Sequence, residues 1–252
     1  MKEMKDNKWE IPSPTQMKQE LKSRKDVRHL RTLTFVSSSF DGGLSIEMLG
    51  DCKYRVGIHV PDISYFVKPN TPLDMHAKRR AMAVHLTNHT IPIWPSEFLS
   101  TLACFNNTND YLAYSVFLVV NKNGAMLRQE ESPWFGRTVV TPRARLCGKD
   151  VARLVNTDPH LEKDYPTSSS SSLLSNKDVD LDVVSDVRQL YAIAQKRQMQ
   201  RTALAAKEPS LSQLCFVMND DQMSSIVDTN DIEMQCLIGE LTMLANKQVA
   251  KQ

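Results

Sequence analysis

The sequence has no long apolar run and no paired cysteines. No stretch approaches the roughly 18 consecutive apolar residues of a membrane-spanning helix, and the N-terminus is charged. The five cysteines stand far apart, without a Cys-x-x-Cys pair or histidines at zinc-finger spacing. These absences argue against a membrane span, a zinc finger and a disulfide framework. We therefore expect a reducing compartment, the cytoplasm or the nucleus.

The chain also lacks a strong excess of charge of either sign. Lysine and arginine number 31, aspartate and glutamate number 29, and the formal net charge is +2. Proteins that coat nucleic acid are strongly basic over the whole domain. Any nucleic-acid site on this chain must therefore be local.

With 252 residues, of which 41% are hydrophobic, the chain can bury one substantial core. Residues 1–31 are basic and contain Pro12 and Pro14, which predicts a flexible lead-in before a domain over residues 32–252. A second biased segment, at about residues 156–182, carries the five-serine run Ser168–Ser172. Its composition predicts a disordered insertion into that domain.

The remaining sequence alternates short apolar runs with turn signals and amphipathic stretches. Strands are predicted over residues 33–36, 44–49, 54–60, 111–120, 125–128, 134–141, 214–218 and 223–227, and helices over 73–84, 147–155 and 183–207. A last helix is predicted to open at Asn230, with Glu233 completing a capping box. It still runs at Gln252, so we expect the domain to be incomplete. The fold class is mixed, α/β or α+β.

Several segments resemble the ribonuclease II-type (RNB) family. Tyr54–Val67 reads YRVGIHVPDISYFV and matches the family signature over fourteen positions. Ile91–Pro95, Leu112–Val116, Trp134–Thr138 and Met243–Asn246 follow in the family's order. The run WFGRT at Trp134 is most similar to the cytoplasmic eukaryotic branch that degrades uridylated RNA, and to fungal relatives that have lost nuclease activity. The resemblance implies the N-terminal half of an RNB domain, with a twisted, largely antiparallel sheet and flanking helices.

The resemblance also implies a chemistry. The family threads single-stranded RNA through a channel and removes nucleotides from the 3′ end by hydrolysis assisted by two Mg²⁺ ions. Two cations a few ångströms apart need a tight cluster of carboxylates, which the family supplies as four aspartates on one loop.

The corresponding loop of this sequence is depleted of acids. Residues 33–45 read LTFVSSSFDGGLS. Aligned on the family pattern, Asp41 matches one aspartate, whereas Ser39 and Gly42 stand where two others are expected. A serine hydroxyl is a weak, neutral ligand and glycine offers no side chain. We expect Mg²⁺ not to be retained, with Asp41 as the one remaining catalytic and metal-binding candidate. Alternatively, Asp41 is the first residue of an Asp-Gly hairpin turn.

Other candidates also follow from the resemblance. His85 occupies the place of a tyrosine that the family stacks against a base, and Glu240 matches a glutamate that reaches an RNA sugar, which makes both candidates for RNA binding. The alternatives are a partly exposed histidine and a solvated helix glutamate. For His59 and Asp62 we expect a structural role, because buried polar groups are usually hydrogen-bonded supports.

Three functions remain open. The first is an RNA-binding pseudonuclease that takes single-stranded RNA and engages neither DNA nor a membrane. The second is a working Mg²⁺-dependent 3′ to 5′ exoribonuclease, and the third is a protein-interaction scaffold. A truncated product without function is a further alternative.

Overall fold

The computed structural model of the chain describes residues 12–36, 41–86, 90–95, 98–99, 105, 109–127, 132–156, 180–204, 214–219, 222–228 and 232–251. The chain divides into two compact units. The sheet unit comprises Leu21–Pro61, Phe105–Lys207 and Asp231–Gln252; the second unit comprises Met1–Glu20, Asp62–Cys104 and Glu208–Asn230. Among the described helices, none is both long and apolar enough to cross a membrane.

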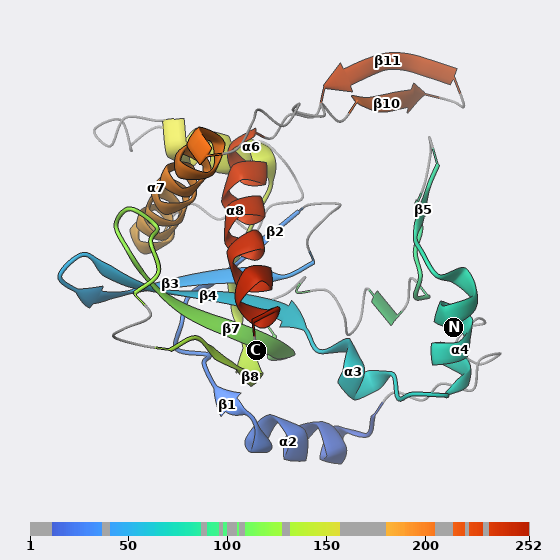
Figure 1. Ribbon diagram of the computed structural model, residues 1–252. Helices are drawn as coiled ribbons and strands as arrows, with labels where there is room; N and C mark the ends of the chain where they lie inside the picture. Colours follow the sequence, from blue (N-terminus) through green and yellow to red (C-terminus); the bar gives the residue numbers. More distant parts are fainter. Residues whose placement is uncertain are drawn as a thin grey trace. The chain divides into compact units, whose positions relative to one another are not determined.

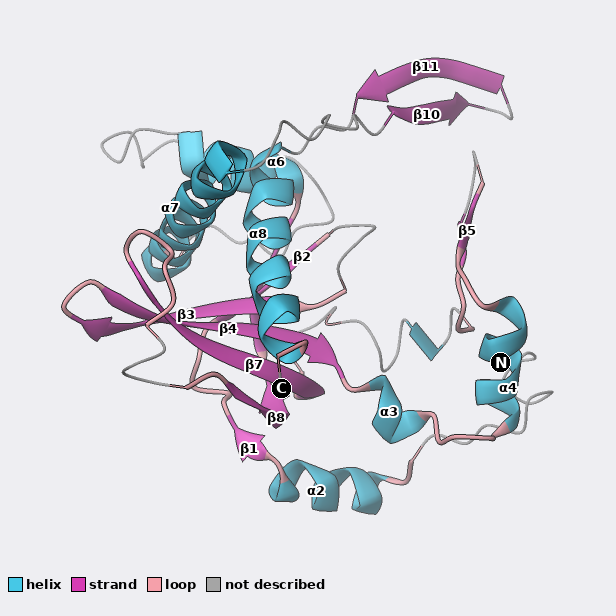
Figure 2. Cartoon of the chain, viewed as in Figure 1, coloured by secondary structure: helices cyan, strands magenta, loops and turns pink. Residues whose placement is uncertain are grey.

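The sheet unit is built on a mixed sheet of seven strands (Figures 1 and 2). The strands are β1 (Lys25–Asp26), β2 (Thr32–Phe35), β3 (Gly43–Gly50), β4 (Lys53–Pro61), β7 (Tyr111–Asn121), β8 (Trp134–Val140) and β9 (Pro142–Leu146). Their order in the sheet is β1-β8-β7-β4-β3-β2-β9. The neighbours β2–β3, β3–β4, β4–β7 and β7–β8 are antiparallel, whereas β1–β8 and β2–β9 are parallel.

The sheet curls back on itself through β8 and β9. Only Thr141 separates these two strands along the chain, yet they pair with different partners, β8 with β7 and β9 with β2. A nearly continuous segment, residues 134–146, therefore joins the second strand of the order, β8, to the last strand at the opposite end, β9.

Tight turns connect the antiparallel strands. Between β3 and β4, Gly50, Asp51 and Cys52 all have positive φ angles, of 97°, 48° and 59°. Positive φ at consecutive turn residues matches the right-handed twist of the flanking strands, so this hairpin stays short. After β7, the side-chain Oδ1 of Asn121 accepts hydrogen bonds from the backbone N–H groups of Asn123 and Ala125, at 2.9 and 3.0 Å.

Three helices belong to the same unit: α6 (Gly148–Asn156), α7 (Leu181–Leu204) and α8 (Ile232–Val249). Helices α7 and α8 cover one face of the sheet (Figure 1). α7 contains no glycine or proline, and its buried residues recur every three to four positions, as a helix with one apolar face requires. In α8 the buried residues also recur every three to four positions.

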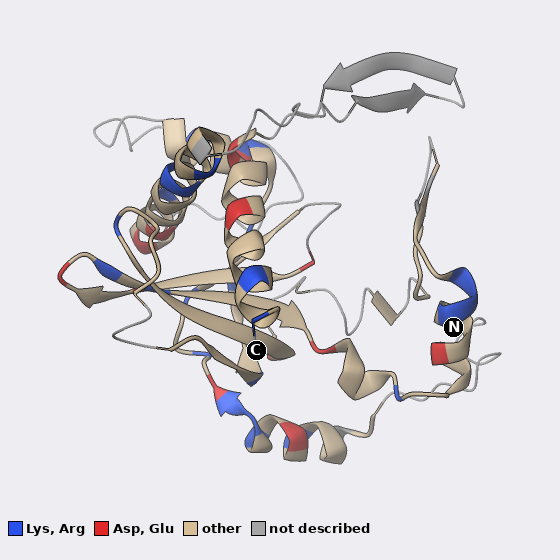
Figure 3. Cartoon of the chain, viewed as in Figure 1, with Lys and Arg blue, Asp and Glu red and all other residues tan. Residues whose placement is uncertain are grey.

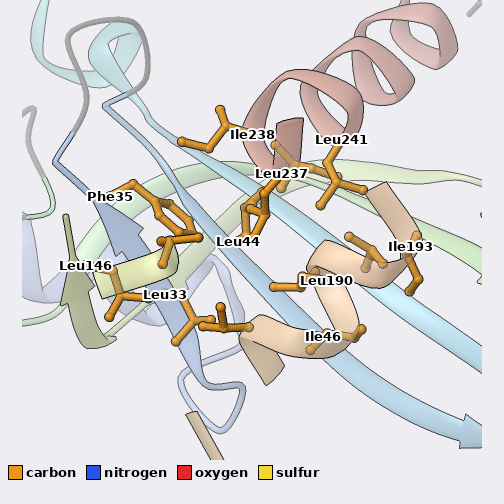
Figure 4. Close-up of a cluster of buried hydrophobic side chains, with 14 of the residues drawn as sticks. Leu33, Phe35, Leu44, Ile46, Leu146, Leu190, Ile193, Leu237, Ile238 and Leu241 are labelled. Carbon is orange, nitrogen blue, oxygen red and sulfur yellow. The ribbon is translucent and has the colours of Figure 1, made fainter. Parts of the chain in front are cut away.

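The main core lies between this sheet face and the helices (Figure 4). Alternate residues of β3, Leu44 and Ile46, point toward the core, and Leu190 of α7 and Leu237 of α8 meet them from the other side. Leu44, Leu190 and Leu237 are fully buried. Each such side chain contributes about 1.5–3 kcal/mol through removal from water.

The second unit holds shorter elements: α3 (Ile63–Phe66), α4 (Pro72–Arg80), β5 (Val84–His85), β6 (Thr90–Ile91), β10 (Leu214–Asn219) and β11 (Gln222–Asp228). Thr71 caps α4 by accepting a hydrogen bond from Asp74 N, and the helix ends where Ala81 adopts a φ of 61°. Basic residues fill the last turn of α4 (Figure 3), where they complement the helix dipole. α2 (Pro14–Ser23) lies partly in each unit.

The structure confirms the predicted fold class, a mixed α/β fold with a largely antiparallel, curled sheet and flanking helices. The basic lead-in, where it is described, contains α2 and β1, which its composition did not indicate. Most of the predicted disordered insertion, residues 157–179, lies outside the described residues, so that assignment stays a prediction; α6 and α7 extend into its two ends. The predicted cap at Asn230 also lies outside them, and α8 begins at Ile232.

Leu237→Ala is expected to lower the free energy of unfolding by about 2–5 kcal/mol, because it removes a fully buried side chain and leaves a cavity. Met243→Ala on the same helix is the control; this side chain is 47% exposed, so its change should stay within about 0.5 kcal/mol. Urea unfolding of both variants measures the difference. Equal midpoints would show that α8 is not packed as described.

Candidate functional site

The loop that the sequence marks as a metal site connects β2 to β3. Its two ends are held by the sheet, since Thr34 pairs with Gly43, and Gly43 pairs with His59 of β4. Val36 N also donates a hydrogen bond to Leu146 O of β9, at 2.8 Å. The connection spans residues 36–42, so the alternative in which Asp41 opens a two-residue Asp-Gly hairpin does not hold.

Asp41 lies at the end of this loop, just before β3, with an exposed side chain. Desolvation by the surrounding protein raises the pKa of its carboxyl above the ordinary value. A carboxylate held among cations has a lowered pKa instead. The shift of Asp41 is of the opposite sign, because desolvation disfavours the charged form of the carboxyl.

The described residues do not fit a two-metal centre. Among them, no group of three histidine, cysteine, aspartate or glutamate side chains lies close enough to hold a metal ion. Such a centre needs several clustered carboxylates, because each must offset part of the charge of two cations. Ser39 lies outside the described residues. Asp41 and Glu240 both belong to the sheet unit, but Glu240 is hydrogen-bonded to Arg201 and not to Asp41.

A chain of buried polar side chains crosses four strands next to this loop. Ser45 Oγ of β3 lies 2.9 Å from His59 Nε2 of β4, and His59 Nδ1 lies 2.7 Å from Ser115 Oγ of β7. Ser115 Oγ in turn lies 2.5 Å from Thr138 Oγ1 of β8. All four side chains are at most 2% exposed. They occupy the strand positions that alternate with the core-facing ones, on the face away from α7 and α8.

Close packing surrounds this polar chain. A Cβ on Gly57 would lie only 2.8 Å from His59 Nε2 and from Phe117 Cε1, and one on Gly43 would lie 2.6 Å from Thr32 Cγ2. Glycine at these positions therefore lets the neighbouring side chains approach. Burial lowers the pKa of His59 to about 3, so its imidazole is neutral and one ring nitrogen donates while the other accepts. Fully enclosed, the histidine reaches no substrate.

Asp62 also acts as a support. Its Oδ1 accepts hydrogen bonds from Ser64 Oγ at 2.6 Å and from Tyr65 N at 3.3 Å, which caps α3. The side chain is buried. The structural roles predicted for His59 and Asp62 are confirmed.

Glu240 lies in α8 with its carboxylate turned toward α7. Its Oε1 accepts a hydrogen bond from Arg201 Nε at 2.9 Å, and only 4% of the side chain is exposed. Contact with an RNA sugar would require this buried carboxylate to become accessible. The RNA-binding role of Glu240 stays a prediction. His85 lies in β5, where its backbone pairs with Thr90, and its side chain lies outside the described part, so its role also stays a prediction.

An exposed row of side chains, which the sequence did not reveal, crosses the sheet. Val60 of β4 pairs directly with Tyr114 of β7, which pairs with Arg137 of β8, so the three side chains share one face. Val60 is 42% exposed, Tyr114 is 41% exposed, and Arg137 is also exposed. The available signal was one of two tyrosines in a largely apolar strand. That pattern is equally typical of a buried tyrosine.

Ion pairs surround a cavity of about 530 Å³, and the sequence did not reveal them either. Arg31 forms a two-pronged contact with the buried Asp186 of α7, at 2.7 and 3.0 Å, and Arg28 pairs with Asp26 and Asp110. These arginines already have carboxylate partners, so the contacts serve to join distant segments. The cavity is lined by Arg28, His29, Leu30, Arg31, Thr141, Pro142, Arg143, Asp180 and Asp182.

Comparison with known proteins decides the family. The family model of the RNB domain matches residues 24–252. The chain belongs to the RNB-domain family. DIS3-like exonuclease 2 of Schizosaccharomyces pombe is 28% identical over 237 residues, which cover 92% of this chain and 25% of that protein. The predicted resemblance is thus confirmed, and the chain spans about a quarter of this relative's length.

Solved structures show the same fold. RNase R of Mycoplasma genitalium, in complex with ribose-methylated single-stranded RNA, superposes with a TM-score of 0.72 at 15% identity, over 98% of this chain and 38% of that one. Yeast Ssd1, described as a pseudonuclease, superposes with a TM-score of 0.63 at 16% identity, over 92% of this chain and 26% of that one. The fold therefore occurs both in a ribonuclease and in a protein without that activity.

The buried His59 makes stability depend on pH. Its pKa is lower in the folded chain than the ordinary value of 6.5, so only the unfolded chain takes up a proton here between about pH 6.5 and 3. The contribution of neutral His59 to the free energy of unfolding is complete above pH 6.5. It is lost as the pH falls, and the loss is about 1.4 kcal/mol at pH 5.5. Unfolding curves at pH 7.5 and 5.5 should show this loss in the wild type and a smaller one in His59→Gln. An identical loss in both proteins would contradict the assignment.

Proposed function

We propose that this chain is an RNA-binding member of the RNB-domain family that does not hydrolyse RNA. The observation that carries the proposal is the loop before β3, where Asp41 is the one carboxylate and Ser39 and Gly42 stand at two of the places of the family's other aspartates. The RNA would be single-stranded, as the family resemblance implies; RNase R with the same fold has been solved with single-stranded and with double-stranded RNA. The free cysteines Cys52, Cys147 and Cys236 are compatible with a cytoplasmic or nuclear location, which we also propose.

The physical basis is the number of anions at the loop. A two-metal mechanism places two divalent cations beside an RNA phosphate, and the ligand carboxylates must offset their mutual repulsion. One carboxylate in residues 33–45 does not supply enough negative charge to do so. RNA binding has no such requirement, because phosphate contacts and base stacking are made by basic and aromatic side chains. The fold can therefore still bind RNA after the metal site has been lost.

An active exoribonuclease is the second candidate, favoured by the S. pombe relative, which is named an exonuclease. In that case the metal ligands would come from residues outside the described part or outside this chain.

Magnesium should not stabilise the folded chain. An ion that binds only the native state raises the melting temperature with its concentration, and a single exposed carboxylate gives Mg²⁺ too weak a site to do so. Thermal melts of EDTA-treated protein, with and without added Mg²⁺, measure the effect, and Asp41→Asn is the control. A rise with Mg²⁺ in the wild type that Asp41→Asn abolishes would show a working metal site.

The full chain should bind a 5′-labelled single strand without shortening it. Binding is expected at low salt and should weaken as salt rises, because phosphate contacts release counterions. EDTA-sensitive shortening in Mg²⁺ buffer would overturn the proposal and support the active enzyme. Absence of binding even at low salt would favour the scaffold.

A doubly substituted chain, Ser39→Asp with Gly42→Asp, tests the loop directly. It should remain inactive, because the leading aspartate-proline of the family pattern and the spacer after it have no counterpart in residues 33–45, which leaves the loop shorter. Rescue of activity would show that the missing carboxylates alone account for the loss.

A further inference from the structure

We propose that the row Val60–Tyr114–Arg137 binds one unpaired nucleobase of single-stranded RNA, with the base stacked on Tyr114. This inference rests on the proposed RNA-binding function and assigns to it a contact point. The three residues lie on adjacent strands in direct register, so their side chains form one short platform across β4, β7 and β8. Adjacent strands are about 4.8 Å apart, which makes the platform roughly 10 Å wide.

The rows on either side of this one are buried or pack against the core. The next pairs along the strands, Ile58 with Val116 and Val116 with Phe135, lie in the core or pack against it beneath the helices. On the other side, Leu112 and its partner Val139 are buried at 3% and 1% exposure. An aromatic side chain with 41% of its surface accessible therefore stands between two buried rows of the same sheet face.

The chemistry of the row suits a base with its phosphate. A tyrosine ring on a sheet surface stacks on any base, because every base has a π-face, and such stacking does not depend on sequence. The guanidinium of the neighbouring Arg137 can contact the phosphate of that nucleotide or stack on a base. No carboxylate stands in the row to repel that phosphate, and the central sheet around it is largely uncharged (Figure 3).

A protein partner is a poorer fit. Stable protein interfaces bury about 800 Å² on each partner, involving 20–30 residues. Three exposed side chains bounded by buried rows offer far less area. A flat base with its sugar and phosphate matches this size and charge better.

The test uses the full chain and two fluorescein-labelled strands of equal length, an oligouridine and an abasic strand. Loss of stacking in Tyr114→Ala should weaken oligouridine binding roughly 5- to 150-fold. Binding of the abasic strand should be unchanged, and Tyr114→Phe should bind like the wild type. Arg137→Gln should weaken both strands and lower the slope of log affinity against log salt by about 0.7.

Met48→Ala, an equally simple truncation of a 61% exposed residue on β3, and Lys122→Gln, a charge removal in the turn after β7, are the matched controls. Melting temperatures show whether each variant folds. If the wild type binds neither strand, the proposed function itself fails and the platform with it. If the wild type binds and folded Tyr114→Ala binds equally well, or loses both strands equally, only the platform is overturned.

Discussion

The architecture depends on one chain segment, residues 134–146, which pairs with two separate strands of the sheet, β7 and β2. β8 extends β7, and after one residue β9 lies beside β2, which curls the sheet. On the face away from the helices, side chains pack closely around Gly43 and Gly57. The sequence meets that constraint with glycine at 43 and 57 and with small hydroxyl residues around one imidazole. Because these polar groups are enclosed, they must satisfy one another, and the hydrogen-bonded chain from Ser45 to Thr138 does so.

The same constraint fixes the candidate site. The loop before β3 starts and ends at residues held by backbone pairing, so its position does not depend on the side chains it carries. Acidic residues on such a loop can be replaced while the strands beneath it stay paired. This separation accounts for a chain that keeps the family's fold and signature segments while its acidic loop has one carboxylate.

The sequence was sufficient to predict those strands and helices whose residue pattern is local. The strands of the β3–β4 hairpin alternate core-facing and other residues around a Gly-Asp turn, and α7 lacks glycine and proline over its whole length. A strand was predicted over residues 134–141 and none over 142–146, because nothing local shows that the chain pairs with a new partner after Thr141. From the sequence, Glu240 was predicted to be either a solvated helix residue or an RNA ligand. Its partner Arg201 could not be inferred, because it lies 39 residues away in the sequence. The exposure of Tyr114 likewise depends on which rows the helices cover, and that is a property of packing.

The long-range pairing of β2 with β9 also bears on how the chain folds. The hydroxyl of Thr34 donates to the carbonyl of Ala144 across 110 residues, whereas β3 and β4 meet through a turn of a few residues. The entropy of closing a loop grows with its length, and contacts distant in sequence slow folding. The antiparallel hairpin can therefore form early, and closure by β9 must wait until residue 146 is available. During synthesis on a ribosome, the outer edge of β2 stays open until then, and an open strand edge is the kind of surface on which unfinished chains associate.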